Sequence, residues 1–95
     1  MPFPNQQPQP FNRATIENLN AGQAGCYGLF GGGVWVYVGE SDDLRRRLLE
    51  HLGGDNSCIT NNWPSHFVTV VTPNRDAVQA ALIAELQPLC NVQLK

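Results

Sequence analysis

Four side chains between residues 27 and 51 are spaced as members of one chemical site would be. Tyr27 and Tyr37 are ten residues apart, Arg47 follows ten residues later, and His51 comes four residues after Arg47. Phenol and imidazole groups can orient or transfer protons. A guanidinium group makes permanently charged, bidentate contacts with phosphate. The set therefore predicts acid–base chemistry close to a phosphate group.

Each of the four residues also has a purely structural interpretation. Tyr27 and Tyr37 would form a half-buried aromatic pair, Arg47 would be a surface charge, and His51 would cap the C-terminal end of a helix. Taken singly, these interpretations are about as plausible as the functional one. Together they leave the regular spacing unexplained.

Two strands are predicted over residues 26–30 and 34–38, joined at three consecutive glycines. A three-residue loop places Tyr27 directly opposite Tyr37, so that both hydroxyls lie on one face of the sheet. Val36 and Val38 then lie on the opposite, core face. A two-residue loop would instead pair Tyr27 with Val36 and separate the tyrosines. We predict the register in which Tyr27 faces Tyr37.

A helix is predicted to follow, with Ser41 as its N-cap and its end near Leu52, before two glycines. Leucines recur at helical spacing and form an apolar stripe along it. Arg47 and His51 lie at the edge of that stripe, one turn apart. The helix therefore presents both side chains to one pocket beside the sheet.

The net charge of −2 gives the protein no general attraction to nucleic acid, so any phosphate contact must be local. The only dense basic cluster is Arg45-Arg46-Arg47. Consecutive helical residues point in different directions, and Arg46 is expected to pair with Glu50 in solvent. Arg45 and Arg47 remain the candidate nucleic-acid contacts.

The remaining elements predict an α+β fold. Residues 12–20 form a short helix, residues 53–65 a loop, residues 67–71 a central strand and residues 75–86 a last helix. The fold class is a small three-stranded antiparallel sheet flanked by helices, in the order β-β-α-β-α. Gln79 falls within the apolar stripe of the last helix, where an unpaired amide costs a few kcal/mol. It is either a hydrogen-bonded core residue or part of a wet cleft.

Length and composition predict one small domain. The chain has 95 residues, of which 42% are hydrophobic. Residues 1–11 are rich in Pro and Gln and are expected to be a disordered or extended arm, and residues 12–95 a single domain. The three cysteines show no metal-ligand spacing and are interpreted as reduced, structural thiols of a cytoplasmic protein. No apolar run is long enough for a membrane span, and no signal peptide is expected.

The order of elements and the tyrosine motifs resemble the GIY-YIG endonuclease family. The resemblance covers about residues 25–91. It rests on the sequences Gly-Cys-Tyr and Tyr-Val-Gly, on Arg47 and His51, and on Asn91 after Pro-Leu-Cys. It implies hydrolysis of DNA phosphodiester bonds with a divalent metal, Mg²⁺ or Mn²⁺. It also implies that the tyrosines and His51 orient or deprotonate water, that Arg47 neutralises phosphoryl charge, and that Gly39 and Asn91 are supporting residues.

Two positions depart from the family pattern. Glu40 follows the Tyr-Val-Gly motif, where DNA-repair members often have lysine. Gln79 occupies the position, twelve residues before Asn91, at which the family has its metal-binding glutamate. A neutral amide gives up the Coulomb attraction for a hard cation, so catalysis is expected to be impaired and the metal weakly bound. Gln79 is either natural in a degenerate member or an engineered change in an active nuclease.

Three functions remain open at this point. The first is a Mg²⁺-dependent DNA endonuclease, impaired by Gln79. The second is a nucleic-acid-binding module without catalysis, and the third is a protein-interaction domain that uses the N-terminal arm. The sequence does not specify branched, nicked or duplex DNA as the substrate, nor does it decide between a monomer and a dimer.

Overall fold

The computed structural model describes residues 8–92, in which four strands and five helices follow one another along the chain. In chain order they are β1 (Gln9–Pro10), α1 (Arg13–Ile16), β2 (Gly25–Gly31), β3 (Val34–Ser41), α2 (Leu44–Leu52), α3 (Ser57–Asn61), β4 (His66–Val71), α4 (Arg75–Leu86) and α5 (Leu89–Val92). No helix among these residues is long and apolar enough to cross a membrane.

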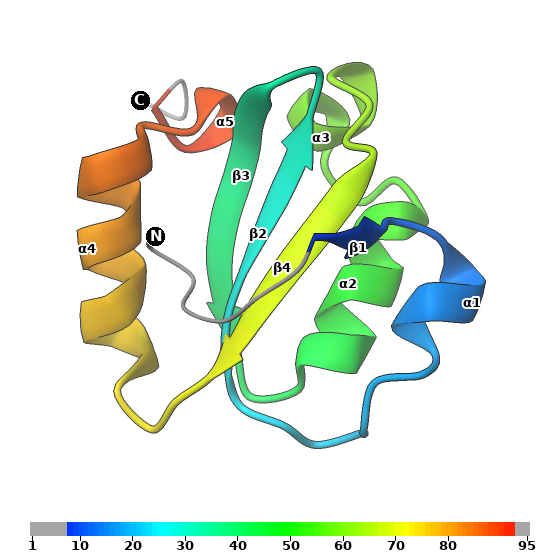
Figure 1. The fold of residues 1–95 in the computed structure, drawn as a ribbon, viewed down its shortest axis with the longest axis vertical. Coiled ribbons are helices and arrows are strands. Elements are labelled where there is room, and N and C mark those ends of the chain that lie inside the picture. Colours follow the sequence, from blue (N-terminus) through cyan, green and yellow to red (C-terminus); the bar gives the residue numbers. More distant parts are fainter. Residues whose placement is uncertain (1–7, 93–95) are drawn as a thin grey trace.

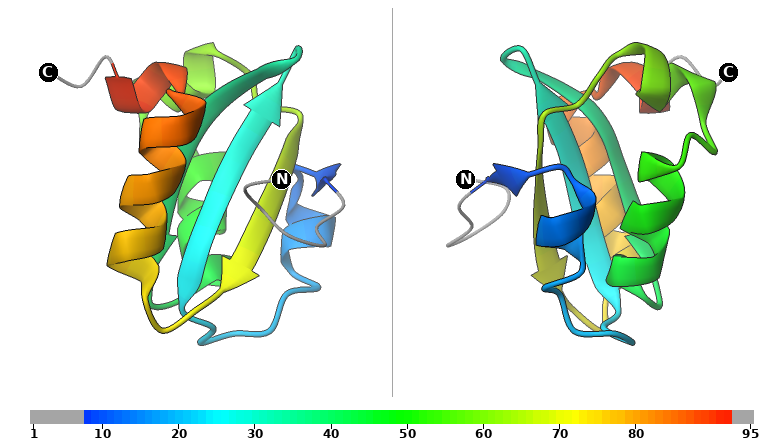
Figure 2. Two further views of the ribbon diagram at one scale, coloured as in Figure 1. Left: turned by 60° about the vertical axis from the view of Figure 1, so that its left-hand side comes forward. Right: turned by 90° about the vertical axis from the view of Figure 1, so that its right-hand side faces the viewer.

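The strands form one antiparallel sheet in the order β1-β4-β2-β3, with helices on both faces. Helices α1, α2 and α3 contribute to the core on one face, and α4 covers the other (Figures 1 and 2). The predicted α+β class and the central position of the third predicted strand, β4, are confirmed. The fourth strand, β1, pairs with the first two residues of β4, His66 and Phe67, and lies within the predicted arm. Residues 1–7 of that arm lie outside the described part of the chain.

The hairpin between β2 and β3 differs from the predicted register. Its loop contains two residues, Gly32 and Gly33, whose φ angles of 61° and 76° are those of a turn that suits twisted strands. A β-bulge in β3 then shifts the pairing by one residue. As a result Tyr27 lies opposite Gly39, and Tyr37 lies opposite Leu29.

The predicted direct pairing of the two tyrosines is therefore wrong, but their predicted location on one face is correct. A two-residue loop alone would have separated them, and the bulge restores the alternation by adding one residue to β3. The bulge also moves Val36 onto the tyrosine face, where it packs in the same cluster as Tyr27 and Leu29. Val38 remains on the α4 face with Cys26, as predicted.

Helix α2 forms as expected, with a different cap. Asp43 is the N-cap, and its carboxylate accepts a hydrogen bond from the backbone N–H of Arg46 at 3.2 Å. The predicted cap, Ser41, instead accepts the backbone N–H of Asp43 through its hydroxyl oxygen at 3.0 Å, which helps to set the turn before the helix. Leu44 and Leu48 are buried against the sheet. This packing fixes the orientation of the helix over β2 and β3.

The segment predicted as a loop between α2 and β4 contains a helix, α3. Asn56 caps it by accepting hydrogen bonds from the N–H groups of Cys58 and Ile59. Ile59 is buried in the core of the tyrosine face. A single inward residue gives no periodic pattern, which is why the sequence did not indicate this helix.

A disulfide joins Cys58 in α3 to Cys90 in α5, with the two Cα atoms 5.8 Å apart. The prediction that all three cysteines are reduced is wrong for this pair. Reduced thiols therefore no longer support the cytoplasmic assignment. Cys26 is a free, buried thiol, and burial raises its pKa to about 11. It is therefore a core residue with little nucleophilic character.

Candidate active site

The two tyrosine rings lie side by side over Gly39. Their centroids are 6.1 Å apart. A Cβ atom on Gly39 would lie 2.4 Å from the hydroxyl oxygen of Tyr27 and 2.9 Å from the ring of Tyr37. Because no side chain could occupy that space, Gly39 is the residue that lets Tyr27 lie across β3.

His51 connects Tyr27 to a carboxylate. The hydroxyl of Tyr27 is 2.6 Å from Nε2 of His51, and Nδ1 of His51 is 2.9 Å from Oδ1 of Asp55. Burial raises the pKa of Tyr27, so its hydroxyl is protonated, and burial lowers the pKa of His51, so its ring is neutral. Tyr27 therefore donates to Nε2, and Nδ1–H donates to Asp55.

Asp55 also holds Arg47. Oδ2 of Asp55 is 2.5 Å from Nη1 of Arg47, which also pairs with Oε1 of Glu50 at 2.8 Å. Burial alone would raise the pKa of Asp55, but the hydrogen bonds from Arg47 and His51 outweigh it and lower that pKa. One carboxylate thus fixes both the imidazole and the guanidinium group.

Asp55 was missed in the sequence. It lies three residues beyond the end of α2, after Gly53 and Gly54, so its position depends on the path of the loop. Its spacing of four residues from His51 and eight from Arg47 was the available signal. Such spacing predicts contact only where a helix continues, and here the helix stops.

The three consecutive arginines are distributed as predicted. Arg46 pairs with Asp42 at 2.9 Å and with Glu50 at 3.8 Å on the exposed side of α2. Arg45 lies about 160° around the helix from Arg47, so these two side chains do not form one patch. The Nε atom of Arg45 is buried and has no hydrogen-bond partner among residues 8–92. A nucleic-acid contact by Arg45 remains a prediction.

Asn91 supports the site through the backbone. Its Oδ1 accepts the N–H of Val38 at 2.7 Å, and its Nδ2 donates to the carbonyl of the same residue at 2.9 Å. Val38 lies between Tyr37 and Gly39 on β3, which is an edge strand. The side-chain amide of Asn91 therefore satisfies the backbone groups that a neighbouring strand would otherwise pair with, at the point where β3 carries Tyr37 and Gly39.

Gln79 is not joined to this cluster by any contact within residues 8–92. It lies in α4, which packs on the opposite face of the sheet. Its side chain is half-buried. Within the described residues no group of three or more His, Cys, Asp or Glu side chains could hold a metal ion.

Solvent reaches only part of the cluster. Tyr27 is 1% exposed and His51 is 2% exposed, whereas the side chain of Arg47 is 32% exposed. Tyr37 is half-buried, and its ring centroid lies 5.4 Å from that of His51. A ligand would therefore meet Tyr37 and Arg47 first, with Tyr27 and His51 behind them.

Acid should destabilise the folded protein through His51. Because burial lowers its pKa in the folded state, the unfolded chain binds this proton more readily. The free energy of unfolding should fall as the pH decreases from about 6.5, the value in an unfolded chain, through the folded pKa. Asp55 should add a second loss of stability below about pH 3.9, the ordinary pKa of an aspartate, since its folded pKa is also lowered.

Urea unfolding at a series of pH values measures this dependence. The His51→Gln variant should lack the first loss of stability. The His66→Gln variant removes the other histidine and is the matched control, which should retain it. The same acid dependence in His51→Gln as in the unmodified protein would contradict the assignment.

Comparison with known proteins identifies similar structures. No protein-family model and no curated protein matches this sequence. Three similar solved structures are crystal structures of the GIY-YIG N-terminal endonuclease domain of UvrC from Thermotoga maritima. Two are tyrosine-to-phenylalanine variants bound to the catalytic divalent cation, with 26% and 24% sequence identity, a TM-score of 0.71, and coverage of 85% of this chain and 94% of theirs.

The third is the domain with magnesium as its catalytic divalent cation. It is 22% identical to this chain, with a TM-score of 0.68. The match covers 81% of this chain and 92% of the UvrC domain. Each likeness covers more than four fifths of this chain. The resemblance to the GIY-YIG family is therefore confirmed, and the chain has the GIY-YIG endonuclease fold.

Proposed function

We propose that this protein is a GIY-YIG-type endonuclease that hydrolyses phosphodiester bonds in DNA. The observation that carries the proposal is the hydrogen-bonded series Tyr27, His51, Asp55 and Arg47, with Tyr37 beside it. Its fold is that of nuclease domains, and its groups can transfer protons and stabilise phosphoryl charge, as phosphodiester hydrolysis requires.

Arg47 is the group that would contact the phosphate. Its side chain is partly exposed, and its guanidinium has further N–H donors beyond those held by Asp55 and Glu50. Charge that develops on the phosphoryl oxygens during attack would be stabilised by this fixed cation. Burial alone would lower the pKa of Arg47, but its hydrogen bonds with Glu50 and Asp55 outweigh that effect and raise the pKa, so the guanidinium stays charged throughout.

Tyr37 and the Tyr27–His51 pair would orient the attacking water and accept its proton. Tyr37 is the more accessible hydroxyl and would orient the water. A proton accepted by the oxygen of Tyr27 could be matched by transfer of the Tyr27 proton to Nε2 of His51. The resulting imidazolium would be stabilised by Asp55, which already accepts from Nδ1.

The divalent cation bound by the UvrC domains does not fit the described residues of this chain. They offer no cluster of metal-binding side chains, and Gln79 is a neutral amide where the family has a carboxylate. Mg²⁺ prefers anionic oxygen ligands. We therefore propose that the protein binds such a cation weakly and that its nuclease activity is impaired.

Replacing Gln79 with glutamate should increase cleavage of DNA in the presence of Mg²⁺ or Mn²⁺ by about tenfold or more, because the carboxylate restores an anionic ligand. Branched, nicked and duplex DNA should be assayed in parallel, and cation binding should be measured by calorimetry. Ala80→Glu introduces the same charge on the exposed side of α4 and is the matched control, with no gain expected. Inactivity of Gln79→Glu on all three DNAs would argue strongly against the nuclease proposal.

A nucleic-acid-binding module without catalysis is the second candidate. The neutral side chain at position 79 and the lack of a metal cluster among residues 8–92 favour it. It differs from the first candidate in its response to Gln79→Glu, which should then leave binding and cleavage unchanged. If DNA does not bind even at low salt, a protein-interaction domain becomes the better interpretation.

A further inference from the structure

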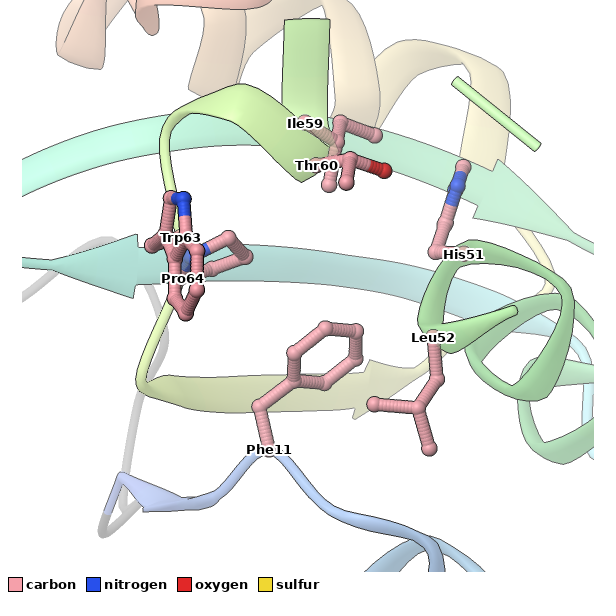
Figure 3. Close-up of a pocket in the computed structure, with 7 residues that line it drawn as sticks. All are labelled: Phe11, His51, Leu52, Ile59, Thr60, Trp63 and Pro64. Carbon is pink, nitrogen blue, oxygen red and sulfur yellow. The ribbon is translucent and has the colours of Figure 1, made fainter. Parts of the chain in front are cut away.

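An apolar pocket of about 290 Å³ lies next to the candidate active site (Figure 3). Its apolar walls come from α2, α3, the loop between α3 and β4 and the segment before α1, and His51 and Trp63 lie at opposite ends (Figure 3). The apolar wall residues are Phe11, Leu52, Ile59 and Pro64. No residue that lines the pocket is an acid, a lysine or an arginine. The lining therefore suits an uncharged, flat ligand better than a phosphate group.

Trp63 is the most unusual part of this pocket. Its side chain is 83% exposed, although it is the largest apolar side chain in the segment. Its φ angle of 49° lies in the left-handed region, which is costly for a bulky residue. Stability alone does not explain an exposed indole on a strained backbone, and both features are typical of residues kept for binding.

The loop that carries Trp63 is held firmly in place. The N–H of Ser65 donates to the carbonyl of Phe30 at 2.9 Å, and the N–H of Phe11 donates to the carbonyl of Ser65 at 2.9 Å. A Cβ atom on Gly31 would lie 3.0 Å from the carbonyl oxygen of Trp63, so the loop packs directly on the end of β2. The pocket is therefore already formed in the absence of a ligand.

His51 relates this pocket to the candidate active site, because it lines the pocket and also contacts Tyr27 and Asp55. We propose that the pocket accepts an unpaired nucleobase of the DNA, stacked against Trp63, close to the nucleotide whose phosphate meets Arg47. This inference rests on the proposed function. Aromatic side chains stack on bases of any sequence, since every base has a π-face.

The proposal predicts that the protein prefers DNA with an unpaired base. A base in a duplex is stacked and paired, so it must leave the helix before it can enter a pocket. A base that is already single-stranded avoids that cost. The pocket would therefore select DNA with single-stranded character near the phosphate that Arg47 contacts.

Fluorescence of Trp63 provides a direct test. The chain has two tryptophans, so the Trp35→Phe variant leaves Trp63 as the only indole. A short thymidine oligonucleotide should quench its emission and bind at least about fivefold more tightly than an abasic oligonucleotide of the same length.

The Trp63→Ala variant, measured by fluorescence anisotropy of labelled DNA, should remove this difference in affinity, and Trp63→Phe should retain part of it. Val71→Ala, another exposed apolar residue, is the matched control and should retain all of it.

The possible outcomes distinguish failure of the pocket proposal from failure of the proposed function on which it rests. If both oligonucleotides bind equally, if emission does not change, or if Trp63→Ala keeps the difference, the pocket proposal is wrong. Arg47→Ala should weaken both oligonucleotides alike and reduce the salt dependence. If that Arg47 effect is seen without any role for Trp63, DNA binding stands and the pocket proposal fails. If neither oligonucleotide binds at low salt, both proposals fail. Circular dichroism shows whether each variant is folded.

Discussion

Replacing Gly39 with alanine should disrupt the candidate site and destabilise the protein by about 1–3 kcal/mol. The added methyl group would lie 2.4 Å from the hydroxyl oxygen of Tyr27 and 2.6 Å from the ring carbon that carries it. Tyr27 is buried and its hydroxyl is fixed by His51, so the ring has no free space into which to move. Either the hydrogen bond to His51 or the pairing of β2 with β3 must change.

The effect on cleavage should exceed the effect on stability. A displacement of about 1 Å in a catalytic group can cost about 100-fold in rate, and this substitution displaces both tyrosines. We expect a loss of that size, measured in the Gln79→Glu background so that a cleavage signal is available. Urea unfolding reports the stability of the same variant.

Gly53→Ala is the matched control for this experiment. A Cβ atom at Gly53 would lie 3.5 Å from its nearest neighbour, which is an ordinary contact, and the φ angle there is −76°. We expect little change in stability or cleavage for this variant. Equal behaviour of the two alanine variants would show that Gly39 does not provide the space occupied by Tyr27.

Replacing Asp55 with alanine should impair the site by removing the carboxylate that holds His51 and Arg47. The change removes the acceptor of Nδ1–H of His51 and one of the two carboxylates paired with Arg47. A buried donor left without a partner costs about 1–3 kcal/mol, so the free energy of unfolding should fall by that amount. Cleavage in the Gln79→Glu background should fall by about 10- to 100-fold, as is typical when a residue that orients a catalytic group is removed.

The pKa of His51 distinguishes orientation from general destabilisation. Asp55 raises that pKa against the larger effect of burial, so Asp55→Ala should lower it further, as measured by NMR titration of the imidazole ring. Asp55→Asn retains an oxygen that can accept from Nδ1–H and should recover part of the activity. Asp42→Ala removes the partner of Arg46 in an exposed ion pair and should have little effect. An unchanged His51 pKa in Asp55→Ala would contradict the proposed role.

Local patterns were sufficient to predict much of the fold. The leucine spacing predicted α2 and its buried face, and Arg47 and His51 emerge from that helix toward the tyrosines, as expected. The alternation of β2 placed Tyr27 on the correct face. These predictions succeeded because each depends on a repeat within one element.

The features that were missed depend on contacts between elements or on irregular backbone. The bulge at Val36 cannot be recognised from the alternation of side chains along the strand, yet it decides which residue lies opposite Tyr27. Asp55 reaches His51 and Arg47 only because the chain turns back after Gly54, and Asn91 reaches Val38 from 53 residues away. The disulfide likewise depends on how α3 and α5 meet, which cysteine spacing does not reveal.

The disulfide has one more consequence for the architecture. Cys58 and Cys90 are 32 residues apart in the sequence, and the chain between them contains β4 and α4. The bond makes that segment a covalent ring, so a protease that cuts once within it produces two polypeptides that remain one molecule. Under oxidising conditions the nicked protein would thus keep its two pieces linked, and under reducing conditions only non-covalent packing would hold them together.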